Sequence, residues 1–286
     1  MSALILSGPG LTPTAVADLS EAFEEGDIRV KPGAVRITGL SPMAERSLLR
    51  KFFTNRDIDA VSVPEDLSIK DFKLLTIDMD STLIQNECID DIAALCGKGD
   101  EVAAVTKAAM EGKLSFAESL TQRCAVLAGA DADCLREALK KVRLTRGAVR
   151  FIDFCHRHGI KTYILSGGFT AITKPVAASL GMAGAVSNEL EIKDGKLTGR
   201  VTGPDGGPIQ DGNGKADRLD AIAANLGVTA SAAIAMGDGA NDLQMIQQAG
   251  LGVAFHAKPM VKMQAPYAID ASGLDAVTLF FKESWD

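Results

Sequence analysis

The alternation of short apolar runs with helix-forming stretches after Lys73 constrains the fold more than any other feature of this sequence. The runs are KLLTI, TYILSGG, AAIAMGDG and LGVAF, and helical stretches such as ITKPVAASLG and NDLQMIQQAG follow them. Parallel strands require a crossover connection, and a helix supplies it while covering one face of the sheet. The sequence therefore predicts an α/β fold with a doubly wound parallel sheet.

Two segments interrupt this alternation. Residues 86 to about 145 contain no convincing strand and are rich in Ala, Leu, Glu and Lys, so we expect a helical cap inserted into the sheet domain. The stretch ELEIKDGKLTGRV alternates polar and apolar residues around Asp194-Gly195, which is typical of a β-hairpin.

Residues 1–70 read as a separate small α+β module. Strand, helix, two strands around a Pro-Gly turn, helix and strand follow one another, which is the order of a ferredoxin-like βαββαβ unit. The stretch PEDLSIKD, with its proline and charges, is interpreted as a linker. We therefore expect one domain over residues 1–70 and a second over residues 71–286.

Composition excludes several classes of protein. The 286 residues carry a net charge of −7 and no Lys/Arg-rich block, so we expect no nucleic-acid partner. No apolar run approaches the length of a membrane span, and the N-terminus lacks the basic region of a signal peptide. Five scattered cysteines without a CxxC pair suit a reducing compartment. We expect a soluble cytoplasmic protein without a membrane partner.

Three of the apolar runs end in polar, turn-forming residues: IDMDST (77–82), LSGGF (165–169) and AMGDGAND (235–242). Ligands of open α/β sheets bind at the carboxyl ends of strands, so these three ends can converge on one crevice. Asp78 and Asp80 would point the same way on an extended chain, so their like charges indicate either a solvated turn or a site built around a cation, which Asp238 could share. Carboxylate oxygens suit Mg²⁺ better than a softer metal.

Each motif also has an ordinary structural explanation. GDGAND could be a tight turn before a helix, Ser166-Gly167-Gly168 a bend after a strand, and Lys215 a surface lysine. Their order and position favour a site, because each motif follows its own apolar strand or begins a helix. Together they offer acidic oxygens, backbone N–H groups, a hydroxyl and an ammonium, as a phosphate and a divalent cation require.

DMDST, the Ser-Gly pair, the lone lysine and GDGAND, in this order, resemble the four motifs of the haloacid dehalogenase superfamily of phosphatases. The resemblance is closer to the phosphoserine phosphatase family, where a glutamate follows the DxDST segment and a GKLSFAESLTQR-like stretch lies in a helical cap. Here these are Glu87 and residues 112–123. The resemblance spans residues 73 to about 272, and the N-terminal module loosely resembles the small regulatory ACT domains attached to some relatives.

The resemblance implies an Mg²⁺-dependent hydrolysis of O-phospho-L-serine to L-serine and phosphate, the last step of serine biosynthesis. Asp78 would be the nucleophile that forms an aspartyl-phosphate, and Asp80 the general acid and base. Asp78, the backbone carbonyl of Asp80 and Asp238 would bind Mg²⁺, and Asp242 would support the metal without binding it directly.

The remaining implied roles concern substrate. Ser166, Gly167 and Lys215 would hold the phosphoryl oxygens, and Asn241 would position substrate or water. In the cap, three further residues would act on the serine part. Glu87 would meet the ammonium, Arg123 the carboxylate, and Phe116 would shield the closed site from water.

Several alternatives stay open at this stage. A receiver domain also phosphorylates an aspartate at a strand end, but it lacks a second acid at the position of Asp80 and a cap of some 55 residues. An inactive homologue, a sibling phosphatase with another small substrate and a phosphotransferase are further readings. Residues 1 to about 70 carry no proposed site residue, so we expect them to be dispensable for chemistry and to serve association, as in a homodimer, or regulation.

Overall fold

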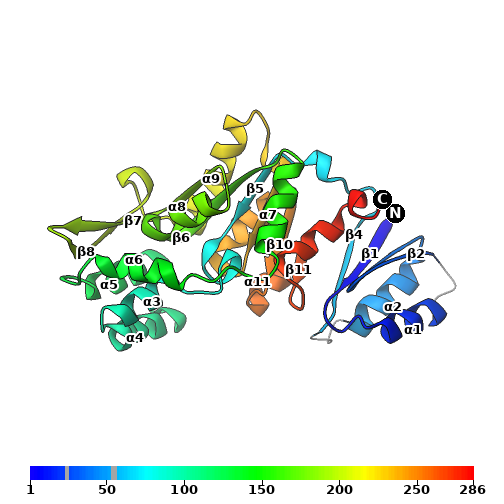
Figure 1. Cartoon of the computed structure of the whole chain (residues 1–286), viewed down its shortest axis with the longest axis horizontal. Coiled ribbons are helices and arrows are strands. Elements are labelled where there is room, and N and C mark those ends of the chain that lie inside the picture. The colour runs from blue at the N-terminus through cyan, green and yellow to red at the C-terminus, as the bar shows by residue number, and fades with distance from the viewer. Residues whose placement is uncertain (23–25, 53–56) are drawn as a thin grey trace.

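The computed structural model describes residues 1–22, 26–52 and 57–286, which form two sheets with their helices (Figure 1). The larger sheet has seven strands in the order β11-β10-β9-β5-β6-β7-β8, and all neighbours are parallel except β7 and β8. The predicted α/β fold is confirmed. The strands are β5 (Leu74–Ile77), β6 (Lys161–Phe169), β7 (Gly184–Lys193), β8 (Lys196–Thr202), β9 (Ala233–Gly237), β10 (Leu251–Phe255) and β11 (Tyr267–Ile269).

Helices cover both faces of this sheet, which explains why β5, β9 and β10 are buried along their whole length. On β5, Leu75 and Ile77 belong to the same apolar cluster as Phe151 of α7, whereas Leu74 clusters with Leu219 of α9. The helices of the two layers are α7 (Ala148–Arg157), α8 (Thr170–Ser179), α9 (Gly212–Asn225), α10 (Leu243–Gln248) and α11 (Pro259–Gln264).

The central strand β5 lies at the point where the chain changes direction across the sheet. Strands β6, β7 and β8 follow on one side of β5, and β9, β10 and β11 on the other. Crossovers that leave in opposite directions open a crevice beyond the carboxyl end of such a strand. The topology therefore places the segment after Ile77 at the position where a ligand site is expected.

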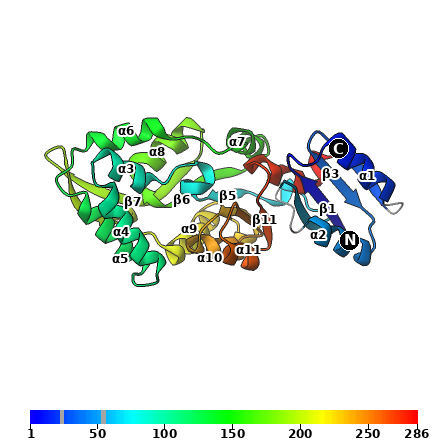
Figure 2. The same ribbon diagram turned by 90° about the horizontal axis from the view of Figure 1, so that it is seen from below.

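Residues 86–145 contribute no strand to the seven-stranded sheet and contain four helices at one end of the molecule (Figure 2). A capping box begins α5, because the Ser115 hydroxyl accepts from the Glu118 N–H and the Glu118 carboxylate accepts from the Ser115 N–H. The β7–β8 hairpin joins this layer, since the Gly129 N–H donates to the Leu197 carbonyl at 2.8 Å. The helices are α3 (Cys88–Leu95), α4 (Gly99–Met110), α5 (Phe116–Val126) and α6 (Asp133–Lys141).

The N-terminal elements form a second, antiparallel sheet of four strands in the order β2-β3-β1-β4, with the helices on one face. Leu4 and Val35 face these helices, whereas Ile5 and Val63 belong to the large apolar cluster of the seven-stranded domain. The centre of the small sheet is therefore buried on both faces, whereas its edge strand Asp27–Lys31 is largely exposed. Its elements are β1 (Ser2–Ser7), α1 (Pro13–Ala22), β2 (Asp27–Lys31), β3 (Ala34–Thr38), α2 (Pro42–Phe52) and β4 (Asp59–Pro64).

The segment interpreted as a linker connects the two sheets but is packed rather than free. Ile69 is fully buried, and the Ser68 hydroxyl and the Ile69 N–H both donate to the Glu283 carboxylate. Its apolar residues Leu67 and Ile69 pack in the large apolar cluster, and the Lys282 N–H donates to the Leu67 carbonyl at 3.0 Å. Among the described residues, none of the helices combines the length and apolar character that crossing a membrane would require.

Candidate active site

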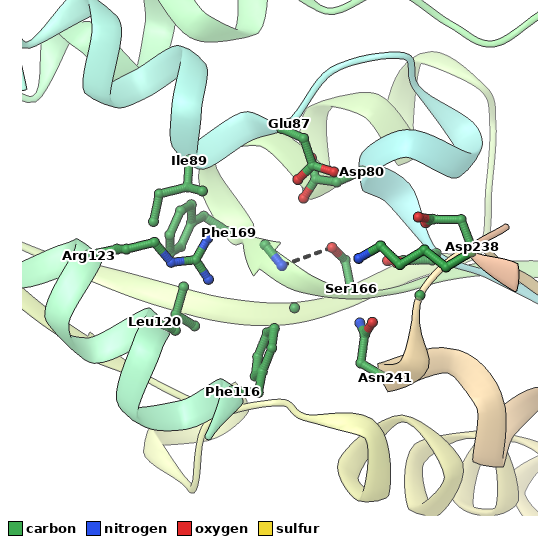
Figure 3. Close-up of a pocket in the computed structure, with 15 residues that line it drawn as sticks. Asp80, Glu87, Ile89, Phe116, Leu120, Arg123, Ser166, Phe169, Asp238 and Asn241 are labelled. Carbon is green, nitrogen blue, oxygen red and sulfur yellow. Dashed lines mark hydrogen bonds between the residues drawn. The ribbon is translucent and has the colours of Figure 1, made fainter. Parts of the chain in front are cut away.

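The ends of the three adjacent strands β9, β5 and β6 meet at one cavity of about 220 Å³ (Figure 3). Because these strands are parallel and in contact, the polar residues that follow them are brought to one edge of the sheet. Lys215 and Asp242 lie fully buried beneath the cavity. The other predicted site residues line it: Asp78, Asp80, Glu87, Phe116, Arg123, Ser166, Gly167, Asp238 and Asn241.

Two aspartates share one buried lysine at the floor of the site. The Lys215 ammonium, on α9, lies 2.9 Å from Asp78 Oδ1 and 2.6 Å from Asp242 Oδ1. The Met79 N–H also donates to Asp78 Oδ1, at 2.7 Å. Across the described ranges no hydrogen bond is made to Asp78 Oδ2, so this oxygen remains for a reaction. The surface-lysine explanation of Lys215 is therefore wrong.

This arrangement places more negative than positive charge in a buried space. Burial raises the pKa of Asp78 well above its usual range, and the charge of Asp242 adds to the rise. Burial by itself lowers the pKa of Lys215, but Asp242 and Asp78 outweigh burial and raise it. A lysine that stays protonated beside two carboxylates leaves a net negative charge, which a cation would neutralise.

The acidic cluster fits a divalent cation. Carboxylate oxygens of Asp78, Asp238 and Asp242 lie within 4.8 Å of one another. Both Asp242 oxygens are already bonded, Oδ1 to Lys215 and Oδ2 to the Gly239 N–H. Asp78 and Asp238 are therefore the side chains with ligand capacity left, and their hard oxygens suit Mg²⁺. Burial raises the pKa of Asp238 to about 6, a rise that a bound cation would reverse.

The turn after β5 aims a second carboxylate into the cavity. Ser81 adopts a left-handed conformation with φ of 56°, and Asp80 Oδ1 accepts from the Cys88 N–H at 3.1 Å. Burial raises the pKa of Asp80 to about 6, and the nearby charge of Glu87 contributes to the rise. A carboxyl with a pKa near neutrality can both give and take a proton, as a general acid and base must.

Two glycines let the cap and the turn after β5 approach β6. A Cβ on Gly167 would lie 2.6 Å from Phe116 Cζ, and one on Gly168 would lie 2.8 Å from Asp80 Oδ2. The Ser166 hydroxyl accepts from the Gly168 N–H at 2.9 Å, so Ser166–Gly168 belong to the end of the strand and not to a loose bend. The sequence analysis did not identify Asn188. Its side-chain amide, on the neighbouring strand β7, donates to the Gly167 carbonyl at 2.8 Å.

The cap contributes one acidic and one basic side chain to the cavity. Glu87 precedes α3 and accepts from the Ser81 hydroxyl at 2.7 Å, which holds it beside Asp80 (Figure 3). Arg123 lies on α5, two turns after Phe116, so both project from one face of the helix. The cavity therefore carries opposite charges on its cap side, above the carboxylates of the sheet.

Some lining residues were not predicted from the sequence. Ile89 and Leu120 give the cap wall its apolar surface, and Leu120 could have been found from its helical spacing after Phe116. Lys258 follows the end of β10, so the strand-end rule applied to LGVAF would have found it. Gly168, Phe169 and Gly239 also line the cavity.

Comparison with known proteins agrees with this geometry. Residues 75–247 match the haloacid dehalogenase-like hydrolase family. The match covers more than half of the chain and includes the three strand ends of the cavity. The chain belongs to the haloacid dehalogenase-like hydrolases.

Relatives within this family carry more specific names. A phosphoserine phosphatase from Polaromonas sp. is 48% identical over 212 residues, which are 73% of this chain and 90% of that protein. The crystal structure of a probable phosphoserine phosphatase from Vibrio cholerae is 35% identical, with a TM-score of 0.82 over 98% of this chain and 85% of that one. A haloacid dehalogenase family hydrolase from Salmonella enterica serovar Typhi is 31% identical, with a TM-score of 0.85 over 99% of both chains.

Relatives differ in how much of this chain they match. A substrate-bound phosphoserine phosphatase structure is 38% identical, with a TM-score of 0.68, and covers 74% of this chain and 99% of its own. That coverage leaves about a quarter of this chain unmatched, whereas the Vibrio and Salmonella structures match almost all of it. The sheet domain with its cap is therefore found both with and without an additional segment.

Proposed function

We propose that this protein hydrolyses O-phospho-L-serine to L-serine and phosphate, the last step of serine biosynthesis. The observation that carries the proposal is that Glu87 and Arg123 line the same cavity as the carboxylates of Asp78 and Asp80. A phosphoserine molecule presents an ammonium, a carboxylate and a phosphate, and the cavity offers Glu87 for the ammonium, Arg123 for the carboxylate and the proposed cation site for the phosphate. The phosphoserine phosphatases at 48% and 44% identity support the same substrate.

In the first step, Asp78 Oδ2 attacks phosphorus, the Asp78 O–P bond forms and the bond from phosphorus to the serine oxygen breaks. Asp80 gives its proton to the departing serine oxygen. In the second step, water attacks the aspartyl-phosphate, Asp80 takes a proton from that water, and Asp78 is released with free phosphate. A raised pKa of about 6 lets Asp80 alternate between the two roles near neutral pH.

The other residues hold the reacting groups. Ser166, Gly167 and Asn241 line the same cavity as Asp78, and the phosphoryl oxygens would lie among them. Lys215 orients Asp78 and offsets its charge. Phe116 rests against Gly167 and limits the access of water.

We also propose Mg²⁺ as the cofactor, held by Asp78, Asp238 and the backbone carbonyl of Asp80. When bound, the cation neutralises charge on the phosphoryl oxygens. Asp242 supports the site through its bonds to Lys215 and the Gly239 N–H. The supporting observation is the excess of buried negative charge. Mg²⁺ is a small, hard cation that prefers oxygen ligands, so it would neutralise this charge.

Three broader proposals complete this picture. Residues 1–70 are proposed as one domain and residues 71–286 as the catalytic domain, with the cap at about 86–145. The protein is proposed to be cytoplasmic, in line with its unpaired cysteines. If it forms a homodimer, the face of the N-terminal sheet opposite its helices is unavailable for pairing, because the seven-stranded domain covers it. The edge strand β2 is largely exposed and is the candidate surface for pairing.

The proposal is tested by measuring phosphate release from phosphoserine, phosphoethanolamine and an aryl phosphate, with Mg²⁺ and with a chelator. We expect kcat/KM for phosphoserine to exceed the others by about tenfold or more, and the chelator to remove activity. Added acceptor alcohols test the phosphotransferase alternative, which predicts a phosphorylated alcohol in place of free phosphate. Equal turnover of all three substrates would favour a sibling phosphatase. Family membership and the cap leave the receiver-domain alternative without support.

A further inference from the structure

Lys258 lines the cavity but has no part in the reaction described above. It follows β10, whose parallel neighbour β9 ends at the metal-binding aspartate Asp238. Its side chain is exposed and reaches the same cavity as Ser166 and Asn241. A cation is therefore present at the edge of the sheet where the phosphate would enter.

The backbone of Lys258 is held in place from two sides. Its N–H donates to the Asp238 carbonyl at 3.2 Å, which ties it to the metal-binding loop. On the other side, His256 has φ of 46°, and its ring bonds the Ser272 carbonyl at 2.9 Å. Pro259 follows and favours the extended conformation observed at Lys258. The lysine thus stands on a fixed turn and not on a free loop.

The ammonium of Lys258 differs from the other cations of the site because its charge is not committed. Lys215 is buried and already shared by two carboxylates. Arg123 lies at the end of the cavity opposite Asp238 (Figure 3). Within the described part of the chain, the Lys258 ammonium forms no ion pair or hydrogen bond. It is therefore free to meet an anion at the Asp238 end.

The position of Lys258 beside Asp238 supports this reading. Both residues line the same cavity, and the Lys258 N–H donates to the Asp238 carbonyl. The charge that attracts an anion to this end of the cavity must also repel a divalent cation placed beside it. One side chain can thus act in opposite directions on the two ligands of the pocket.

We propose that Lys258 binds the phosphoryl group of the incoming substrate at the Asp238 end of the cavity and does so at the cost of weaker cation binding. The proposal rests on the proposed phosphatase function. A dianionic phosphate is drawn toward a cleft that presents an uncommitted cation, which lowers KM without changing the chemistry at Asp78. The charge of Lys258, and not its apolar stem, makes this contact with the phosphate.

The test compares three variants of the full chain. Lys258→Met keeps the apolar stem and removes the charge, and Lys258→Arg keeps the charge. Lys262→Met is the matched control, because it removes the same charge from α11 but leaves the cavity lining intact; Lys262 pairs with Asp270 at 2.8 Å. Measurements are KM and kcat with phosphoserine, inhibition by inorganic phosphate at saturating Mg²⁺, and Mg²⁺ binding to substrate-free protein by calorimetry.

For Lys258→Met we expect KM and the inhibition constant of phosphate to rise about 3- to 30-fold, the range for one partly solvated charge pair. The same variant should bind Mg²⁺ more tightly, while kcat changes little. Lys258→Arg should restore phosphate binding, and Lys262→Met should resemble the wild type. Unchanged phosphate inhibition, or weaker Mg²⁺ binding in Lys258→Met, would overturn the proposal.

These outcomes are separable from failure of the proposed function. If the wild type does not hydrolyse phosphoserine, inhibition of any phosphomonoester hydrolysis by inorganic phosphate and calorimetric Mg²⁺ binding still report on Lys258. If the wild type hydrolyses phosphoserine but Lys258→Met and Lys262→Met behave alike, Lys258 contributes only to the overall positive charge of this part of the surface and the proposal is wrong.

Discussion

Asp59 lies on the face of the N-terminal sheet that packs against the seven-stranded domain, here called the docking face. Asp59 and Asp78, at the active-site edge, are both buried carboxylates, but their partners differ. Asp59 Oδ1 accepts from the N–H groups of Asp270 and Ala271, and Oδ2 from that of Ser272, at 2.7–2.9 Å. These backbone donors are uncharged, and each gives its hydrogen bond to Asp59. Asp78 instead shares one lysine with Asp242 in a space that holds further carboxylates.

The difference separates a carboxylate that stabilises the fold from one that prepares a reaction. At Asp59, removing the acceptor would leave buried N–H groups without partners, which costs stability. At the active site, the excess of negative charge costs stability by itself and is relieved by a cation or a proton. Neutralising the two aspartates should therefore have opposite effects on unfolding.

The largest effect is expected for Asp78→Asn. A neutral amide is a poor nucleophile and a weak metal ligand, so phosphatase activity should fall about ten-thousandfold or more. The melting temperature of the metal-free variant should nevertheless rise, because one buried charge is removed while Lys215 keeps Asp242 as a partner. Activity assays and calorimetric melting measure the two effects. Loss of activity together with a lower melting temperature would contradict the comparison.

At the docking face, Asp59→Ala should lower stability by about 3 kcal/mol or more, since it leaves three N–H groups of residues 270–272 unpaired. Activity per folded molecule should stay near the wild-type value, because no proposed site residue lies in the N-terminal sheet. Denaturant unfolding measures the change, and Asp71→Ala, which removes an exposed carboxylate, is the control. Equal stability of the two variants would refute the role of Asp59.

The same comparison modifies the expectation that residues 1–70 are dispensable. A chain that begins at Ser68 would keep every proposed site residue but uncover the face on which Ile5 and Val63 pack. Exposed apolar surface of this kind promotes aggregation. The module is therefore expected to act on stability and solubility before it acts on chemistry.

Intermediate effects are expected in the cap. Arg123→Ala should lower kcat/KM for phosphoserine by roughly one to two powers of ten, since a hydrogen bond to a charged group contributes about 1.5–3 kcal/mol. Hydrolysis of phosphoethanolamine, which has no carboxylate, should change little. Arg136→Ala, an exposed cap arginine that pairs with Asp133 at 2.9 Å, is the control for general damage.

Glu87→Gln provides the complementary case, because it should affect substrates with an ammonium and spare those without one. The measurement is kcat/KM for each substrate with each variant. Equal losses on all substrates would remove the argument for serine recognition by the cap and leave the phosphatase activity intact.

The smallest effect is a pH dependence of stability in the metal-free protein. The pKa values of Asp80 and Asp238 are raised to about 6 in the folded state, so the folded state binds more protons than the unfolded state between about pH 4 and 6. Stability contributed by these groups is present at low pH and is lost as the pH rises through 6. The melting temperature should fall by a few degrees across this window.

Saturating Mg²⁺ is the control for this prediction. The cation requires ionised carboxylates, so it should raise the melting temperature at pH 7.5 and have little effect at pH 4.5. A metal-free protein that becomes more stable as the pH rises from 4 to 6 would contradict the assignment of excess negative charge to the active-site edge.

The sequence by itself determined the elements of the sheet and the positions of the proposed catalytic carboxylates. Continuous apolar runs of strand length predicted β5, β6 and β9, and the polar residues after each run predicted where the site would form. These features are local, because the length of an apolar run and the position of its end depend on neighbouring residues. The resemblance of DMDST and GDGAND to a known family added the roles of these residues.

Only the tertiary structure decided which distant side chains meet. Asp59 and residues 270–272 are more than 200 positions apart, and nothing in either segment indicates the other. Likewise, Lys258 enters the cavity because β10 lies beside β9, and Gly167 must lack a side chain because Phe116 of the cap lies against it. Contacts of this kind depend on how complete layers pack, and packing is a property of the whole chain and not of any short segment.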